Sequence, residues 1–443
     1  MKKDIMSLYN SLLNKIILPI GDAFFGGSYT KYLKEWEAND LKTEFELKVL
    51  QKKRLIKILE HAKRHVPFYE NQTYSGLKDF PILTKDVLRN SKQNLISNEY
   101  NRAKLTEHHS SGSTGLQSFT YMTKDHQFYL RALQTHWWKW SGYNIGDNLL
   151  QFGISQKRSF TKRLKDFFYR CDYVKAFGLS EDELLDTSKR SIKRNKLFIA
   201  GYPSVINELA KSSLKTNFKN VEGVICYGDK LFNGYVKNIS DAFGSSVNII
   251  DTYGCAEGLL MACTKDLDYY YIMSPHVYIE IVDDNGNDVK DGEMGNVLVT
   301  CLTNHAMPLI RYKLGDLAIM LPREDYPKKR ALNYPLLKKV VGRETDVVKT
   351  KKGITLNVHS FTGIFEHYQN IKQFKIIQND LEHIFVEYIL DTNYKSNTST
   401  LKEIEKKFLD LTHNSLNITF CKVESIKPTK SGKPQIIESN LVS

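Results

Sequence analysis

Short apolar segments that alternate with helical stretches are the feature that most constrains the fold of this chain. Three of them, KLFIA (196–200), GVICY (223–227) and VNIID (247–251), have the length and composition of strands. Helical periodicity appears between them, for example in SVINELAKS (204–212). An alternation of this kind is typical of an α/β fold.

Different patterns flank this segment. The N-terminal part is predicted to be mostly helical, and one long amphipathic period stops at Pro67. From residue 276, two strand-like segments flank a turn at Asn285 and Gly286, which predicts a β subdomain. We expect the Pro-rich, charged segment 322–335 to be an exposed connection. The expected parts are a helical region (1–100), an α/β core with a β subdomain (101–343) and a small α+β unit (344–443).

Composition fits an ordinary globular protein. The chain has 443 residues, of which 41% are hydrophobic, so it can bury a large core in two or three domains. Its cysteines form no CxxC pair, which argues against a disulfide framework or a zinc site. We expect reduced, mostly buried thiols and a cytoplasmic protein. The cysteines are Cys171, Cys226, Cys255, Cys263, Cys301 and Cys421.

The N-terminal segment is apolar but is interrupted by polar residues, so it is predicted to be neither a signal peptide nor a membrane span. Its apolar residues recur near helical spacing. We expect a helix packed on the protein, with peripheral contact to a membrane surface as the less favoured alternative. These residues are Ile5, Leu8, Leu12, Leu13, Ile16 and Ile17.

The net charge of +13 is compatible with an acidic partner. The lysines are spread along the chain, and no helix-turn-helix, zinc finger or aromatic RNA-binding signature accompanies them. We therefore predict no nucleic-acid partner. A nucleotide or another anionic metabolite accounts for the charge equally well, as does a solvated surface.

The stretch HHSSGSTGLQSF (108–119) concentrates hydroxyl groups and glycines. It is compatible with a plain turn and with a phosphate-binding loop, in which glycines admit the anion and N–H and O–H groups donate to it. A Walker A loop is excluded because Leu116 and Gln117, and not a lysine, follow Gly115. If this loop holds phosphate, its cation comes from elsewhere in the chain.

Each of five later stretches could by itself be an ordinary turn or surface loop. Their order and spacing, taken together with this loop, would rarely arise by chance. The five stretches are CYGDKL (226–231), DTYGCAEG (251–258), RYKLGDL (311–317), VGRETDVVK (341–349) and KPTKSGKP (427–434).

Together the six stretches resemble those of the adenylate-forming superfamily, which includes acyl-coenzyme A synthetases, peptide synthetase adenylation domains and luciferases. The resemblance covers essentially the whole chain. HVPFYE (65–70), FPILTKDVL (80–88) and IKQFKIIQ (371–378) resemble the branch of phenylacetate-coenzyme A ligases and CapK-type capsular polysaccharide proteins, of which CapK-type is the nearer. This implies a large α/β body followed by a small mobile α+β C-terminal domain.

The implied activity is ATP-dependent, AMP-forming activation of a carboxylate with Mg²⁺, followed by acyl transfer to a thiol, such as that of coenzyme A, or to an amine. By resemblance, the loop cradles the β- and γ-phosphates, Glu257 holds Mg²⁺ and acts in catalysis, Asp316 accepts both ribose hydroxyls, and Lys433 is the catalytic cation. Gly228, Asp229, Tyr253 and Gly254 border the adenine, and Arg343 approaches the nucleotide. The loop residues are Ser110, Ser111, Gly112, Ser113, Thr114 and Gly115.

Some positions depart from the pattern of the superfamily. Ala256 stands where a phosphate-contacting Thr is usual, and Thr345 stands at the usual hinge Asp, with Asp346 next to it. Gln117 and Ser118 replace a Pro and a Lys after the loop. We expect an active enzyme because the main site residues remain. The alternatives are a phenylacetate-coenzyme A-like ligase and a non-catalytic nucleotide-binding scaffold of a polysaccharide assembly complex.

Overall fold

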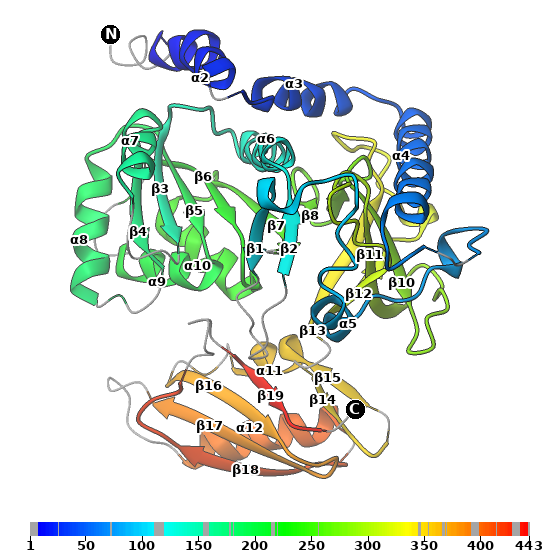
Figure 1. Cartoon of the computed structure of the whole chain (residues 1–443). Helices are drawn as coiled ribbons and strands as arrows, with labels where there is room; N and C mark the ends of the chain where they lie inside the picture. The colour runs from blue at the N-terminus through cyan, green and yellow to red at the C-terminus, as the bar shows by residue number, and fades with distance from the viewer. Residues whose placement is uncertain are drawn as a thin grey trace.

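The protein consists of a large α/β body and a smaller C-terminal domain with its own sheet, as predicted (Figure 1). The structure is a computed structural model of the 443-residue chain. It describes all residues except 1–7, 25, 71–72, 110–118, 154–158, 177–178, 180, 214–217, 219, 256, 344–346, 353, 366–367, 369, 391–397, 413, 428–434 and 442–443.

The described residues of the body form an eleven-stranded sheet in the order β10-β11-β12-β13-β9-β8-β7-β6-β5-β3-β4. Its parallel half confirms the predicted strands, and every residue of β5 is buried. Helices lie on the connections between these strands. The strands are β3 (Asn148–Gly153), β4 (Cys171–Lys175), β5 (Leu197–Gly201), β6 (Val221–Cys226) and β7 (Asn248–Cys255), and the helices are α7 (Phe160–Phe168), α8 (Glu181–Ile192), α9 (Pro203–Ser213) and α10 (Asn233–Phe243).

The other half of the sheet is antiparallel, so the strands predicted from residue 276 are confirmed, and they continue the same sheet as the parallel strands. Its hairpin turn carries Gly286 at φ +84°, a left-handed conformation that favours glycine. One expectation is wrong, because the connection 322–335 is only partly exposed. Leu332 and Tyr334 are buried, and Tyr334 donates to Asp40 Oδ1 at 3.1 Å. The strands are β8 (Leu259–Cys263), β9 (Tyr270–Ile272), β10 (Val277–Val282), β11 (Met294–Cys301), β12 (Tyr312–Met320) and β13 (Leu336–Arg343), with the short helix η4 (Arg323–Asp325).

Helices dominate the N-terminal part. The longest, α4 (Glu44–His65), begins with a capping box between Thr43 and Glu46. It ends before Val66, which is extended because Pro67 follows. The other elements are η1 (Leu13–Ile17), α2 (Leu18–Phe24), α3 (Tyr29–Asn39), η2 (Leu77–Asp79), α5 (Lys85–Asn90), η3 (Arg102–Lys104), β1 (Thr106–His109), β2 (Phe119–Met122) and α6 (Lys124–Trp140).

The N-terminal helical segment packs on the body through one face only. Leu13 is buried and Ile17 lies against a core cluster that contains Trp36 and Trp137. Leu8, Leu12 and Ile16 are exposed, so the expected packing holds for part of the apolar set, and Ile5 lies outside the described residues.

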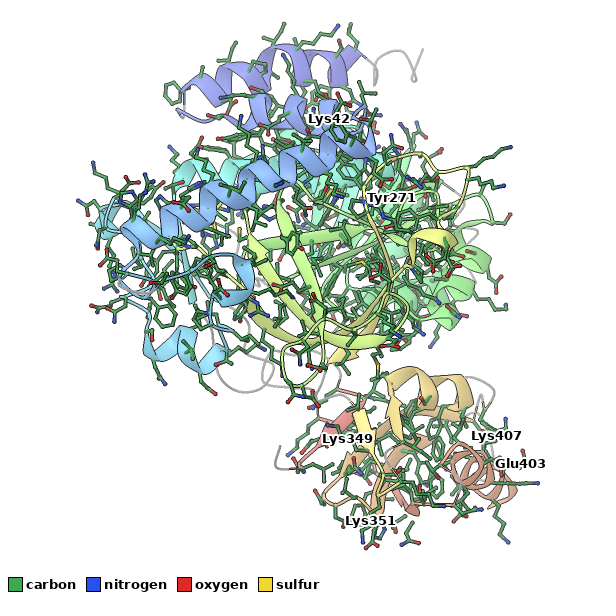
Figure 2. All side chains as sticks on the ribbon, turned by 90° about the vertical axis from the view of Figure 1, so that its right-hand side faces the viewer. Lys42, Tyr271, Lys349, Lys351, Glu403 and Lys407 are labelled. Carbon is green, nitrogen blue, oxygen red and sulfur yellow. The ribbon has the colours of Figure 1, made fainter. Side chains whose placement is uncertain are left out.

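The C-terminal domain has a four-stranded sheet in the order β18-β17-β16-β19 and a core around Phe361 and Phe408. Phe232, at the start of α10 in the body, packs against this core. Figure 2 shows the domain below the body, with Lys351 and Lys407 among the side chains on its surface. Its elements are β14 (Val347–Lys349), β15 (Thr355–Asn357), α11 (Val358–Phe365), β16 (Ile371–Gln378), β17 (His383–Leu390), α12 (Thr398–Leu411), β18 (Asn417–Lys422) and β19 (Ile437–Ser439).

All six cysteines are free, and Cys226, Cys263 and Cys301 are buried. Among the described residues, no helix combines the length and the apolar character needed to cross a bilayer.

Candidate active site

The carboxyl end of β6 lies beside the middle of β7, because the parallel register pairs Cys226 with Asp251, and β7 continues beyond it to Cys255. In open α/β sheets this edge is where ligands bind. Gly228 follows β6 with φ +87°, and a Cβ there would lie 2.3 Å from Tyr202 Cε1. Only glycine fits this position. The sequence therefore places a glycine where the turn approaches an aromatic ring closely.

Asp229 and Lys230 connect this turn to other elements. Ser204, on α9, donates a hydrogen bond to Asp229 Oδ2 at 2.5 Å. The Lys230 ammonium donates to the carbonyl oxygen of Val341 on β13. The loop after β6 is thereby tied to the strand that leads to the C-terminal domain.

Tyr253 and Asp316 are brought together from distant parts of the sequence. The Tyr253 hydroxyl donates to Asp316 Oδ2 at 2.9 Å. Burial, and then the nearby Asp316 carboxylate, raise the pKa of Tyr253, so the phenol remains a donor at neutral pH. Gly254, next to Tyr253, is exposed at the end of β7. The predicted ribose ligand and the predicted adenine turn therefore form one site.

Arg343 lies beside Asp316 along the backbone, since the antiparallel register of β12 and β13 pairs the two residues. The structure describes the backbone of Arg343 but not its side chain. Its predicted approach to the nucleotide remains a prediction.

Glu257 is the buried carboxylate of the site, with 7% of the residue exposed. Tyr312, at the start of β12, donates to its Oε1 at 3.1 Å. Burial raises the pKa of the Cys255 thiol. The negative charges of Glu257 and, more weakly, of Asp316 raise it further. The thiol beside Glu257 is therefore protonated at neutral pH.

The predicted phosphate loop lies outside the described residues, but both flanks are described. β1 and β2 are antiparallel and pair His109 with Phe119, so residues 110–118 connect the ends of a hairpin. Thr120, on β2, donates through its hydroxyl to the Glu257 carbonyl oxygen at 3.3 Å. The C-terminal flank of the loop is therefore fixed beside Glu257.

Lys433, Ala256, Thr345, Asp346, Gln117 and Ser118 also lie outside the described residues. Their predicted roles remain predictions.

Two neutral histidines and a carboxyl group with a raised pKa lie near the site. Burial lowers the pKa of His126 and of His276 to about 3, so both rings are neutral at physiological pH. His276 Nδ1 lies 2.8 Å from the Thr303 hydroxyl, and its Nε2 lies 3.3 Å from the Gly258 carbonyl oxygen. Burial raises the pKa of Asp251 to about 7 despite the hydrogen bond from Tyr270. The two histidines therefore add no charge around Glu257.

The Glu257 carboxylate is a suitable ligand for Mg²⁺. Mg²⁺ is held in nucleotide sites by one or two carboxylates together with substrate phosphates, and Glu257 supplies a carboxylate that Tyr312 orients. The ion would neutralise phosphate charge there.

Three residues of this site were missed in the sequence, namely Tyr312, Thr120 and Ser204. Tyr312 has a weak signal, because it belongs to the motif that contains Asp316. Thr120 and Ser204 lie in ordinary strand and helix patterns that give no signal of their contacts.

Comparisons with known proteins agree with this geometry. The AMP-binding enzyme family matches residues 178–302, and the CapK C-terminal domain matches residues 348–440. Protein CapK of Staphylococcus aureus is 23% identical over 449 residues, which cover 95% of each chain. Phenylacetate-coenzyme A ligase of Escherichia coli is 30% identical over 175 residues, 38% of this chain and 36% of the relative.

A solved structure with the same fold is 2-hydroxyisobutyryl-CoA ligase. In its postadenylation state with a bound acyl-AMP, it superimposes with a TM-score of 0.71 at 15% identity, over 91% of both chains. In its thioesterification state with CoA, the TM-score is 0.56 over the same share. The chain therefore combines an AMP-binding enzyme domain with a CapK C-terminal domain, and its relatives CapK and phenylacetate-coenzyme A ligase support an adenylate-forming enzyme of the CapK-type branch.

Proposed function

We propose that this protein activates a small-molecule carboxylate as its acyl adenylate, at the expense of ATP, and then transfers the acyl group to a thiol or an amine. The proposal rests on two hydrogen bonds at the carboxyl edge of the sheet. Tyr253 donates to Asp316, and Tyr312 donates to Glu257.

The reaction joins two anions. A carboxylate oxygen attacks the α-phosphorus of ATP, a C–O–P bond forms, and pyrophosphate leaves. Asp316 would hold the ribose, because a carboxylate can accept two hydroxyl hydrogens side by side. The backbone and hydroxyl donors of Ser110–Gly115 would hold the leaving phosphates. Lys433 would neutralise charge at the reacting oxygens.

Biosynthesis of capsular or cell-surface polysaccharide in the cytoplasm is the setting that we propose. The full-length similarity to CapK supports it, as do the unpaired cysteines. A phenylacetate-coenzyme A-like ligase is the second candidate, supported by the local similarity to those enzymes and by solved relatives that bind CoA. A non-catalytic nucleotide-binding scaffold is the third, since Ala256 removes a hydroxyl from the site.

Carboxylate-dependent exchange of labelled pyrophosphate into ATP tests the proposal with the full chain and pools of acids. Exchange that requires an acid supports adenylation, and coenzyme A or amines added afterwards identify the acceptor. Nucleotide binding without exchange for any acid in pools of aryl, acyl, sugar and amino acids would favour the scaffold.

Replacing Asp316 by Ala is expected to weaken ATP binding by about 2 kcal/mol, because it removes a charged hydrogen-bond acceptor. Tyr253→Phe should cost about 1 kcal/mol, since it removes only the hydroxyl that orients Asp316. Calorimetric titration with ATP measures both. Asp291→Ala, at an exposed position, is the control. Equal affinity of the Asp316 variant and this control would refute the ribose assignment.

We further propose that the protein contacts an anionic membrane surface through its N-terminal helix and α7. The helix exposes an apolar residue at every fourth position, and α7 exposes three phenylalanines and a leucine. The two elements touch, because Tyr9 donates to the Phe168 carbonyl oxygen and Arg170 lies over the Tyr9 ring. The exposed residues are Leu8, Leu12, Ile16, Ile20, Phe24, Phe160, Leu164, Phe167 and Phe168.

Charge favours a lipid surface over an apolar protein partner. Lys162, Arg163 and Lys165 of α7 are exposed between its apolar residues, and Lys15 is exposed on the N-terminal helix. Apolar residues flanked by lysine and arginine are typical of helices that lie at a bilayer interface.

Co-sedimentation with vesicles of neutral or partly anionic lipid tests this contact. Burying one phenylalanine contributes about 1.5 to 3 kcal/mol, so Phe160→Ser with Phe167→Ser should weaken binding at least roughly tenfold. Leu381→Ser with Leu411→Ser, at exposed positions of the C-terminal domain, is the matched control. No binding to anionic vesicles, or equal loss in both variants, would contradict the proposal.

A further inference from the structure

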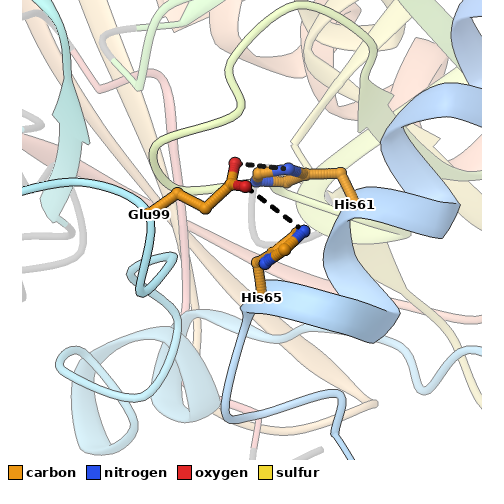
Figure 3. A group of neighbouring side chains, drawn as sticks. All are labelled: His61, His65 and Glu99. Carbon is orange, nitrogen blue, oxygen red and sulfur yellow. Dashed lines mark ion pairs between the residues drawn. The ribbon is translucent and has the colours of Figure 1, made fainter.

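Two histidines and a glutamate converge away from the nucleotide site (Figure 3). His61 and His65 lie four residues apart on one face of α4, near its C-terminal end. Glu99 comes from the segment that leads to β1. His61 Nδ1 lies 3.5 Å from Glu99 Oε2, and His65 Nε2 lies 3.3 Å from Glu99 Oε1. One donor atom of each residue lies within 4.8 Å of the others.

The hydrogen bonds of His61 fix its tautomer. Its Nε2 lies 2.8 Å from the His305 carbonyl oxygen, which can only accept, so the proton is on Nε2. In the neutral ring, Nδ1 then carries a lone pair, and this lone pair faces a carboxylate oxygen. Two electron-pair donors face each other, and a cation between them satisfies both. Histidine ligands of metals characteristically donate their other N–H to a carbonyl oxygen in this way.

In the neighbouring His305, one ring nitrogen also faces a carbonyl oxygen. Its Nδ1 lies 3.4 Å from the Thr303 carbonyl oxygen, and its ring centroid lies 5.1 Å from that of His61. Its Nε2 is buried and has no hydrogen-bond partner among the described residues.

We propose that His61, His65 and Glu99 bind a divalent transition metal ion, with zinc as the best match. Tetrahedral zinc with ligands at about 2.0 to 2.1 Å has ligand atoms about 3.3 to 3.4 Å apart, close to the two separations seen here. Two imidazoles with one carboxylate favour zinc over Mg²⁺, which prefers oxygen ligands and water. Glu99 and His65 are partly exposed, so an ion can enter and water can complete its shell.

The position of the site indicates a structural role. Backbone bonds already fix this segment, from Asn98 N–H to the His65 carbonyl oxygen at 2.7 Å and from Ser97 N–H to that of Ala306 at 3.0 Å. The ion would fasten the end of α4 to the chain that enters β1 and then the residue 110–118 connection. The inference does not depend on the proposed ligase activity.

Zinc titration of the tag-free, chelator-treated full chain against a chromophoric competitor tests the site, without nucleotide present. One tight zinc ion per chain is expected, together with an intense visible Co²⁺ spectrum of tetrahedral type and a higher melting temperature with zinc. His65→Ala and Glu99→Gln should each weaken binding by roughly a hundredfold or more, above the effect of losing an outer-shell partner.

His383→Ala, in the C-terminal domain, is the matched control and should bind zinc like the unaltered chain. Glu99 is half exposed, so we expect Glu99→Gln to remain folded. If His65→Ala does not fold, zinc binding by Glu99→Gln decides the result. No tight zinc binding by the unaltered chain, or zinc binding that survives both Glu99→Gln and His65→Ala, would overturn the proposal.

Discussion

Replacing Lys433 by Ala is expected to lower the rate of adenylate formation by roughly two to three orders of magnitude, the scale of losing one preorganised charge stabiliser. Lys433 lies more than a hundred residues beyond Asp316, in the C-terminal part of the chain. If it reaches the reacting oxygens only while the adenylate forms, its removal lowers kcat more than it raises KM. ATP affinity should stay within about a few fold, since the interaction is made mainly in the transition state.

Transfer of the acyl group from a preformed adenylate should survive this substitution. 2-Hydroxyisobutyryl-CoA ligase has been solved in a postadenylation state and in a thioesterification state. In this chain, we expect Lys433 to act in the adenylation step alone, so its loss should leave acyl transfer intact. Rapid-quench kinetics of each half-reaction measures both steps. Lys430→Ala, three residues away in the same stretch, is the matched control. Equal loss of both half-reactions in a folded Lys433 variant would identify the lysine as a structural clamp.

Replacing Arg311 by Met is expected to destabilise the body by about 3 kcal/mol, because it removes a buried ion pair and the donor to three carbonyl oxygens. Glu280 then keeps only the half-exposed Lys78, at 2.8 Å, as its ion-pair partner. Arg311 is 6% exposed and Glu280 is 4% exposed. Arg311 Nε donates to Glu280 Oε1 at 3.2 Å, and its other nitrogens donate to carbonyl oxygens. The acceptors of these bonds are the carbonyl oxygens of Lys78, Phe80 and Gly286.

Arg311 thus joins three segments, which are residues 78–80, the strand that contains Glu280 and the turn at Gly286. Methionine keeps the apolar stem of the arginine side chain but has no charge and no hydrogen-bond donor. Arg323→Met is the matched control, because Arg323 pairs with Glu44 at an exposed position where an ion pair contributes about 0 to 1 kcal/mol. Denaturant midpoints by circular dichroism compare the two variants. A midpoint for Arg311→Met as high as that of the control would show that this network contributes no more than a surface pair.

Local patterns in the sequence predicted most of the fold. The strands β5, β6 and β7 have apolar runs bounded by turns, and the end of α4 is set by Pro67, so each is determined by adjacent residues. The connection 322–335 was misjudged because Tyr334 is buried by a partner, Asp40, that lies 294 residues away. The charge and proline content of a segment indicate its local tendency to be an exposed loop. They do not reveal contacts with residues that are distant in the sequence.

The candidate site shows the same division. Resemblance of motifs pointed to Glu257 and Asp316 as candidate site residues, but the hydroxyl groups that orient them were not predictable from spacing. Tyr312 reaches Glu257 across 55 residues through the pairing of strands. Similarly, the helical period of the N-terminal segment does not reveal which apolar face is covered, because Leu12 and Leu13 are adjacent but only Leu13 is buried.

The link between the body and the C-terminal domain is short. Arg343 pairs with Asp316 in the sheet of the body, and Val347 already packs with Leu317 and Val341. Three residues separate Arg343 from Val347, and three residues span at most about 10 Å. A tether of this length would hold the C-terminal domain, and with it the lysine that we propose to act in catalysis, at a high effective concentration near the site. A C-terminal domain supplied as a separate chain would lack this advantage, so its rescue of a truncated body would depend on its concentration.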